Sequence, residues 1–60
     1  MSGVLGARVA RFSRLANISA ETAKRFFLGE KCSETTLVKI EQAKAINPEL
    51  FESIVSALGQ

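Results

Sequence analysis

Apolar residues recur at spacings of three and four along nearly the whole chain, from Val4 to Leu58. This spacing is typical of α-helices that bury one face, because a helix completes a turn every 3.6 residues. An alternation of apolar and polar positions, which would indicate strands, never continues over a useful length. The pattern therefore predicts an all-α fold, with four helices in a single domain over residues 1–60.

The first two helices are expected on either side of a short turn. The first runs from about Ser2 or Gly3 to Ala16 and carries a core stripe of Leu5, Val9, Phe12 and Ala16. Asn17 follows, where a chain leaving a helix often takes the left-handed conformation that Asn tolerates. The second helix begins after Ser19, whose hydroxyl can accept from the free amides of the first turn, and ends at Gly29.

Two further helices are predicted in the second half of the chain. The third begins at the cap residue Ser33, and its apolar positions are Leu37, Ile40, Ala43 or Lys44, and Ile46. It ends at Asn47, because a residue before proline is disfavoured in helical geometry. Pro48 suits the first position of the fourth helix, which has Asn47 as its cap, reaches about Leu58 and closes at Gly59.

The fourth helix carries more apolar surface than one helix of so small a domain needs inside. One stripe consists of Leu50, Ile54 and Ala57, and its neighbour consists of Phe51, Val55 and Leu58. A monomer that exposed the second stripe would present an apolar patch of a kind that soluble monomers usually avoid. We therefore expect Phe51, Val55 and Leu58 to join two copies in a homodimer. The alternative is that this helix simply covers the core.

Composition excludes several classes of function. The chain has no His, no Trp and a single Cys32, so we expect no internal disulfide, no metal site, no cofactor and no catalytic base or nucleophile pair. Cys32 is expected to be a small filler between helices. We predict neither an enzyme nor a small-molecule substrate. The apolar runs are far shorter than the roughly 20 residues that span a bilayer, and no leader is seen, so a cytoplasmic protein without a membrane partner is expected.

Charge is distributed unevenly between the two halves of the chain. Residues 1–31 hold six basic and two acidic side chains, a net charge of +4, whereas residues 32–60 hold two basic and four acidic ones, a net charge of −2. A basic half indicates an anionic partner, since contacts with phosphates supply the sequence-independent part of nucleic-acid affinity. The alternative is a solvated surface with uneven charge.

The basic half also has the layout of a helix-turn-helix over about residues 9–28. Ala16 is small enough for two helices to cross closely, Asn17 suits the turn, and Ile18 is apolar and expected to be buried. Ala23 and Phe26 then anchor the second helix. In this motif the second helix enters the major groove of DNA. A helix advances about 100° per residue, so Lys24 and Arg25 face outward when Ala23, Phe26 and part of Phe27 face inward.

The stretch ARFSRLANISAETAKRFFLGEKCSETTLVKIEQA resembles the DNA-binding headpiece of lactose-repressor-type bacterial regulators, and the resemblance covers residues 10 to about 46. That family's pattern runs roughly V-A-x-x-A-G-V-S-x-x-T-V-S-R-x-L-N-G, followed by V-S-x-x-T and a third helix. The positions that match in register are Ala16, Ser19, Thr22, Arg25, Gly29 and the run 33–36. More broadly, the chain is similar to the lambda-repressor-like or Cro-like superfamily of phage and plasmid regulators.

Three departures from the headpiece pattern modify this picture. Asn17 replaces the usual turn Gly, and Ala23 stands where a β-branched residue is commoner, with Phe26 and Phe27 available to fill the space. We expect neither a hinge helix nor a ligand-binding domain to follow. We therefore expect a small stand-alone regulator and not an inducer-controlled repressor.

The resemblance implies a set of DNA contacts on the second helix. Base edges would be met by Ala20, Glu21 and Arg25, and phosphates by Ser19, Thr22 and Lys24. Arg25 would bind guanine through two hydrogen bonds, Glu21 would accept from cytosine N4, and Ala20 would touch a thymine methyl group. Further contacts with the DNA backbone would come from Arg11, Arg14 and Lys31.

The predicted function is thus sequence-specific binding of double-stranded DNA by a homodimeric transcription regulator, a small phage- or plasmid-type repressor in the bacterial cytoplasm or nucleoid. Two alternatives stay open. The same scaffold could serve as a protein-interaction module, since a fold does not fix a function, and its binding would then be insensitive to salt. It could also serve as an RNA-binding accessory protein, which would prefer structured or single-stranded RNA over duplex DNA.

Overall fold

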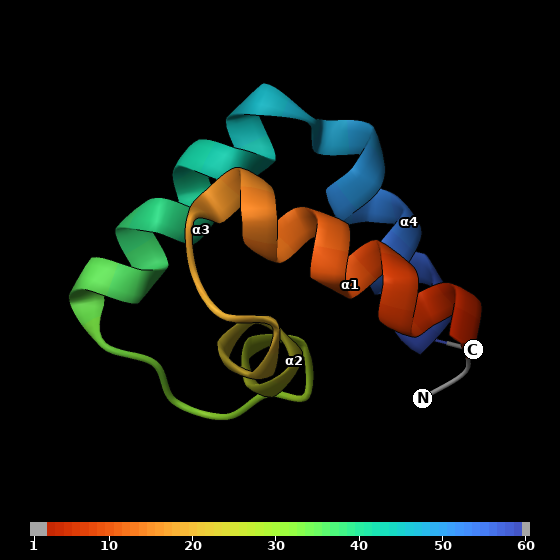
Figure 1. Cartoon of the computed structure of the whole chain (residues 1–60), viewed down its shortest axis with the longest axis horizontal. Helices are drawn as coiled ribbons and strands as arrows, with labels where there is room; N and C mark the ends of the chain where they lie inside the picture. The colour runs from red at the N-terminus through yellow and green to blue at the C-terminus, as the bar shows by residue number, and fades with distance from the viewer. Residues whose placement is uncertain (1–2, 60) are drawn as a thin grey trace.

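A computed structural model of the chain describes residues 3–59. It contains four helices in the order α1 (Gly3–Ala16), α2 (Ala20–Phe27), α3 (Glu34–Ile46) and α4 (Pro48–Leu58) (Figure 1). Every regular element in this range is helical, which confirms the predicted all-α fold of four helices. α1 begins at Gly3, one of the two expected starts, and the other, Ser2, lies outside the described residues.

The turn between α1 and α2 has the predicted chemistry. Asn17 has a φ of 57°, in the left-handed region. Its amide donates to the Arg14 carbonyl at 3.2 Å, and the Ile18 amide donates to the Ser13 carbonyl at 3.0 Å. These two bonds form a Schellman motif, which satisfies carbonyls that the end of a helix leaves free. The sequence of the turn therefore ends α1 at Ala16.

α2 ends with the same kind of hydrogen-bonded turn. Gly29 has a φ of 89°, its amide donates to the Phe26 carbonyl, and the Glu30 amide donates to the Arg25 carbonyl, both at 3.0 Å. Glycine takes this conformation without the clash that a Cβ atom brings. One Schellman motif thus ends α1, and a second one ends α2.

Asparagine and serine caps begin the later helices as the sequence predicts. The Ser33 hydroxyl accepts from the Thr36 amide at 3.3 Å at the start of α3. The Asn47 side-chain oxygen accepts from the Leu50 amide at 3.2 Å at the start of α4. A cap of this kind satisfies one of the amides that have no partner within the helix.

A core of eight buried apolar residues draws on all four helices. Its members are Val9, Phe12, Ala16, Ala23, Ile40, Ala43, Leu50 and Ile54. Phe12 is completely buried, and its ring lies 5.3 Å from that of Phe27 and 5.7 Å from that of Phe51, measured between centroids. The rings of Phe27 and Phe51 lie 5.6 Å apart. This aromatic cluster of Phe12, Phe27 and Phe51 therefore joins α1, α2 and α4.

α2 lies at one side of the molecule, below α1 in the view of Figure 1. It packs against α1 and α4 and makes no contact with α3. In the view of Figure 1 it is seen nearly end-on and crosses α1 at a steep angle, while the loop 28–33 leads away from it to α3. Two helices thus hold the inner side of α2, and its outer side has no neighbour within the described residues.

The predicted core stripe of α3 is wrong at two positions. Ile40 and Ala43 are buried as expected, but Leu37 is 40% exposed and Ile46 is 66% exposed. At about 100° per residue, Leu37 and Ile46 lie on opposite sides of the direction defined by the two buried residues. α3 therefore turns a narrower stripe inward than its apolar positions indicate.

The prediction that α4 has a spare apolar stripe is wrong for two of its three members. Phe51 and Leu58 are half-buried and pack against the core together with the expected Leu50 and Ile54, and only Val55 is exposed, at 43%. Phe51 completes the aromatic cluster and also lies 4.8 Å beneath the Lys44 ammonium. Ala57, expected to face the core, is exposed. α4 thus covers the core with a broad side that includes Phe51 and Leu58.

The left-handed residue of the first turn gives a stability prediction. Asn17→Ala should lower the free energy of unfolding by about 1 kcal/mol, because alanine is strained at positive φ. Asn17→Gly should stay within about 0.5 kcal/mol of the parent chain. Urea denaturation followed by circular dichroism measures both.

Gly29→Ala is the matched control for this backbone effect. Its φ is also positive, and no atom lies within 4 Å of the added Cβ, so the substitution adds backbone strain without a steric clash. It should lose an amount of stability similar to Asn17→Ala. An Asn17→Ala protein as stable as the parent would contradict the left-handed turn.

Candidate nucleic-acid interface

The burial of α2 decides which of its side chains are available. Ala23 is fully buried, and Phe26 and Phe27 are half-buried, with their rings 5.3 Å apart. The side chains on the opposite side are exposed and define the outer face of α2: Ala20, Glu21, Lys24, Arg25 and Leu28. The prediction that Lys24 and Arg25 face outward while their phenylalanine neighbours face the core is confirmed.

Ser19 and Thr22 lie side by side at the N-terminal end of α2. The Ser19 hydroxyl accepts from the Thr22 amide at 3.1 Å, so Ser19 is the predicted cap. The two hydroxyl oxygens are 2.7 Å apart and share a hydrogen bond in which either can donate. Since that bond uses one of the two hydroxyl protons, the other is free to donate to an acceptor. The pair can therefore cap the helix and still offer one donor to a phosphate.

Glu21 and Arg25 form an ion pair on the outer face. Arg25 Nε lies 3.5 Å from Glu21 Oε1, and both side chains are more than half exposed. An exposed pair one helical turn apart adds little to stability. Its effect is geometric, because it directs the arginine along the helix surface. The two terminal nitrogens of Arg25 and the second carboxylate oxygen of Glu21 remain available to a ligand.

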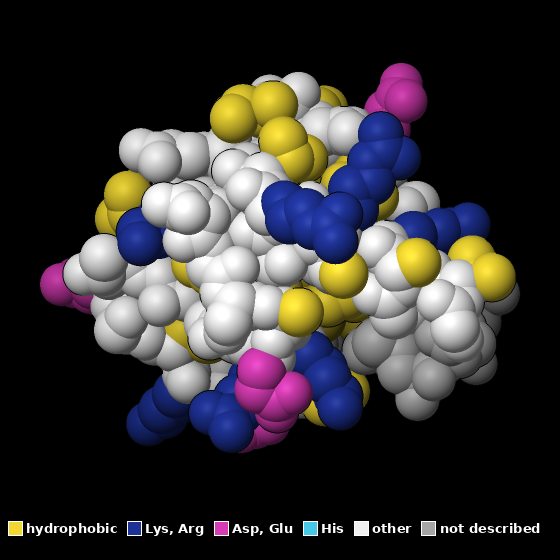
Figure 2. All heavy atoms as spheres, in the orientation of Figure 1, with side chains coloured by type: hydrophobic (Ala, Val, Ile, Leu, Met, Phe, Trp, Pro, Cys, Tyr) yellow, Lys and Arg dark blue, Asp and Glu magenta, His cyan; other side chains and the backbone are white. Residues whose placement is uncertain are grey.

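The other predicted backbone contacts flank this face. Arg14 is exposed in the last turn of α1, next to the turn that leads into α2, and Arg11 is exposed one turn earlier. Lys31 is exposed in the loop that follows α2. Figure 2 shows Lys and Arg side chains over α1 in the centre and over α2 and its following loop at the lower edge, with acidic side chains among the latter. Cationic groups thus occur on both sides of α2.

Leu28 is an exposed apolar residue that the sequence reasoning did not assign to the interface. It follows Lys24 by four residues and is the last residue before the turn of Gly29. Helical periodicity could have placed it there, because residues four apart share a side of a helix. Its position extends the outer face of α2 by one apolar side chain.

Cys32 lies in the loop between α2 and α3. Its side chain is half-buried, and its Sγ atom lies 3.8 Å from the Glu30 carbonyl oxygen as a weak hydrogen-bond donor. Cys32 is neither in the core nor among the hydrophobic residues packed against it, so its expected role as a filler between helices stays a prediction.

Residues 3–59 lack the features of two other kinds of site. No group of three or more Cys, Asp or Glu side chains in this range is placed to hold a metal ion. None of the helices in this range has the length and apolar character needed to cross a membrane. Comparison with protein families, with curated proteins and with solved structures finds no match to the chain.

The two serine caps provide a matched test of the local geometry. Ser19→Ala and Ser33→Ala should each lower the free energy of unfolding by about 1 kcal/mol, because each removes the side chain that accepts from the third residue of its helix. Both caps have the same contacts, with a threonine three residues later. Urea denaturation of the two variants checks this, and an effect of zero for either one would contradict its cap.

Proposed function

We propose that this chain is a sequence-specific DNA-binding protein, a small transcription regulator of the phage- or plasmid-repressor type that acts in the bacterial cytoplasm or nucleoid. The observation that carries the proposal is the outer face of α2. It combines exposed basic side chains with a free hydroxyl donor on a short helix that follows α1 after a three-residue turn.

The dimensions and the setting of α2 suit the major groove. An α-helix with its side chains is about 10–12 Å in diameter, and the groove of B-DNA is about 12 Å wide. Because α2 is packed only against α1 and α4, its outer face can approach a duplex without another element in the way. The end of α1 would then lie near the phosphates, where Arg14 and the Ser19–Thr22 pair can bind them.

In this proposal the ion pair of Glu21 and Arg25 recognises the bases. The terminal nitrogens of Arg25 can donate to O6 and N7 of guanine while Nε keeps its contact with Glu21. The free oxygen of Glu21 can accept from cytosine N4, and Ala20 can touch a thymine methyl group. Lys24 and Lys31, which have no ion-pair partner among residues 3–59, would contact phosphates.

Two copies are proposed to act together on DNA as a homodimer. One short helix and a few cationic side chains give limited affinity, and regulators of this type read two half-sites as dimers. The homodimer stays a prediction. Of the stripe expected to form it, only Val55 is free of the core, so α4 offers no continuous apolar contact surface.

A selection of random duplex DNA tests the proposed function. The chain should enrich one short motif, and its affinity should fall steeply as salt rises, because binding to phosphates releases counterions. Single-stranded and structured RNA of the same length serve as competitors. No enriched motif, stronger binding to RNA, or binding that does not depend on salt would contradict the proposal.

Arg25→Ala and Lys24→Ala should have different kinds of effect on binding to the selected site. Loss of a base-reading Arg25 should relax specificity at one position, with a loss of about 1–3 kcal/mol for the preferred base. Loss of a phosphate contact at Lys24 should weaken all sequences equally and lower the salt slope by about 1. Titrations on matched and mismatched duplexes at several salt concentrations separate the two.

Lys39→Ala is the control for the change in net charge. Lys39 lies on α3, which does not contact α2, so its substitution removes the same charge at a distance from the proposed interface. It should leave specificity unchanged and reduce affinity less than Lys24→Ala. Equal losses on every sequence for Arg25→Ala would contradict the base-reading role.

A further inference from the structure

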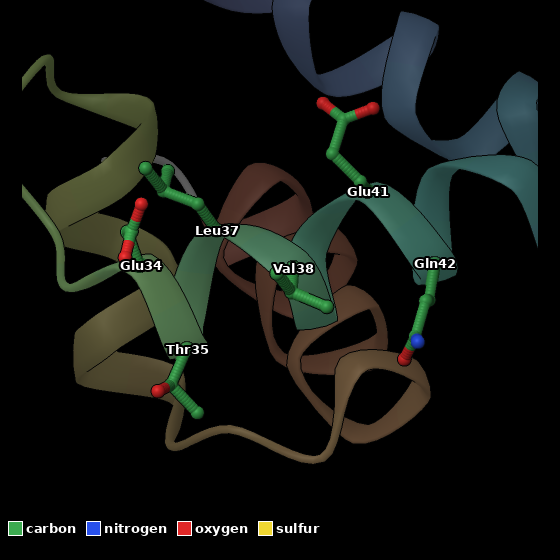
Figure 3. A pocket seen from close by; sticks show the side chains of 6 residues that line it. All are labelled: Glu34, Thr35, Leu37, Val38, Glu41 and Gln42. Carbon is green, nitrogen blue, oxygen red and sulfur yellow. The ribbon is translucent and has the colours of Figure 1, made fainter.

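The outward side of α3 is an exposed apolar surface with acidic flanks. Leu37 and Val38 are 40% and 56% exposed in the middle of this surface. A shallow hollow there is lined entirely by residues of α3, namely Glu34, Thr35, Leu37, Val38, Glu41 and Gln42 (Figure 3). Because no second element supplies an opposite wall, a small molecule would not be enclosed. A surface of this shape suits the side of another helix.

The acidic residues beside this surface indicate what kind of helix can bind it. Glu34 precedes the apolar pair by about one turn and Glu41 follows it by about one turn, so their Cα atoms are about 10 Å apart along the axis. Neither carboxylate has an ion-pair partner among residues 3–59. The helix that covers this surface should therefore carry cationic side chains around an apolar or aliphatic centre.

The chain itself contains such a helix surface. Val4, Arg8 and Arg11 are exposed on α1, and their spacing of four and three residues places them on one side of it. Neither arginine has an ion-pair partner among residues 3–59. This basic side of α1 cannot reach α3 of the same copy, because α1 packs against α3 through its buried side, which holds Val9, Phe12 and Ala16.

We propose that the acidic side of α3 in one copy binds the basic side of α1 in a second copy, head to tail. The aliphatic stems of Arg8 and Arg11 would cover Leu37 and Val38, and their guanidinium groups would extend to Glu34 and Glu41 on either side. Val4 would add apolar contact at the edge. The contact removes exposed apolar surface from both helices and pairs charges that are unpaired in the single copy.

A two-fold contact through either of these two surfaces is disfavoured by the same charges. α3 against α3 would bring four carboxylates together, and α1 against α1 would bring four arginines together. A head-to-tail contact uses different surfaces on the two copies, so it extends into an open chain unless the rotation closes a ring. One helix pair buries less than about 1,200 Å² in total, so the association should be weak and dependent on concentration and salt. The proposal does not require that the chain binds DNA.

Charge reversal tests the contact without DNA. One variant carries Glu34→Arg and Glu41→Arg, and the other carries Arg8→Glu and Arg11→Glu. The parent chain should show an average mass that rises with concentration in sedimentation equilibrium at about 50 mM salt, where the Debye length exceeds 10 Å. Each variant alone should associate at least about tenfold more weakly, because each then opposes like charges.

Mixing the two variants gives the decisive result. Each variant keeps one native surface and reverses the other, so the mixture offers opposite charges at every contact and should regain association. A chain with all four substitutions should regain it as well. A parent chain that stays monomeric up to millimolar concentration, or a mixture that stays monomeric, would overturn the proposal. So would full association of either variant alone.

The folded state of every variant is checked by helical circular dichroism and thermal unfolding. All four substituted residues are exposed, so each variant should keep the parent spectrum. If a doubly substituted variant unfolds, the single changes Glu41→Arg and Arg11→Glu replace it in the same scheme. Recovery in their mixture supports the contact, and its absence contradicts it.

Discussion

The packing of Phe27 against both Phe12 and Phe51 is the contact on which the rest of this structure depends. α2 has only eight residues, and a helix of that length is not stable alone in water. The aromatic cluster ties it to α1 and α4, and the buried Ala23 allows it to approach them closely. Because one side of α2 is fixed in this way, the direction of every other side chain on it is fixed too.

This constraint explains why a basic pair stands directly beside two phenylalanines. Successive residues of a helix point about 100° apart, so the ring that holds α2 inward turns Arg25, two residues earlier, toward solvent. The turn at Asn17 and the cap at Ser19 set where the helix begins, and the ion pair with Glu21 directs the arginine. The proposed interface is thus a consequence of how a very small core is packed.

Sequence reasoning located the parts of the fold that depend on local chemistry. A left-handed asparagine, serine caps and an Asn-Pro junction act through neighbouring backbone atoms, so their residues alone identify the ends of the helices. The inward sides of α3 and α4 could not be found in this way. Both helices carry apolar residues on more than one side, and the choice of Phe51 over Val55 depends on the rings that α1 and α2 bring to it. Leu37 and Ile46 are exposed for the same reason, since the packing of the other helices decides which side of α3 faces inward.

Mapping amide chemical shifts while duplex DNA is added tests the central claim most directly. If the outer face of α2 binds DNA, the shifts that change first should belong to residues 17–28, Arg14 and Lys31, and the outward side of α3 should change little. The amides of Phe12 and Phe51 should keep their shifts, since the fold is already arranged for binding. Changes centred on α3 or α4, or no change at low salt, would contradict the account.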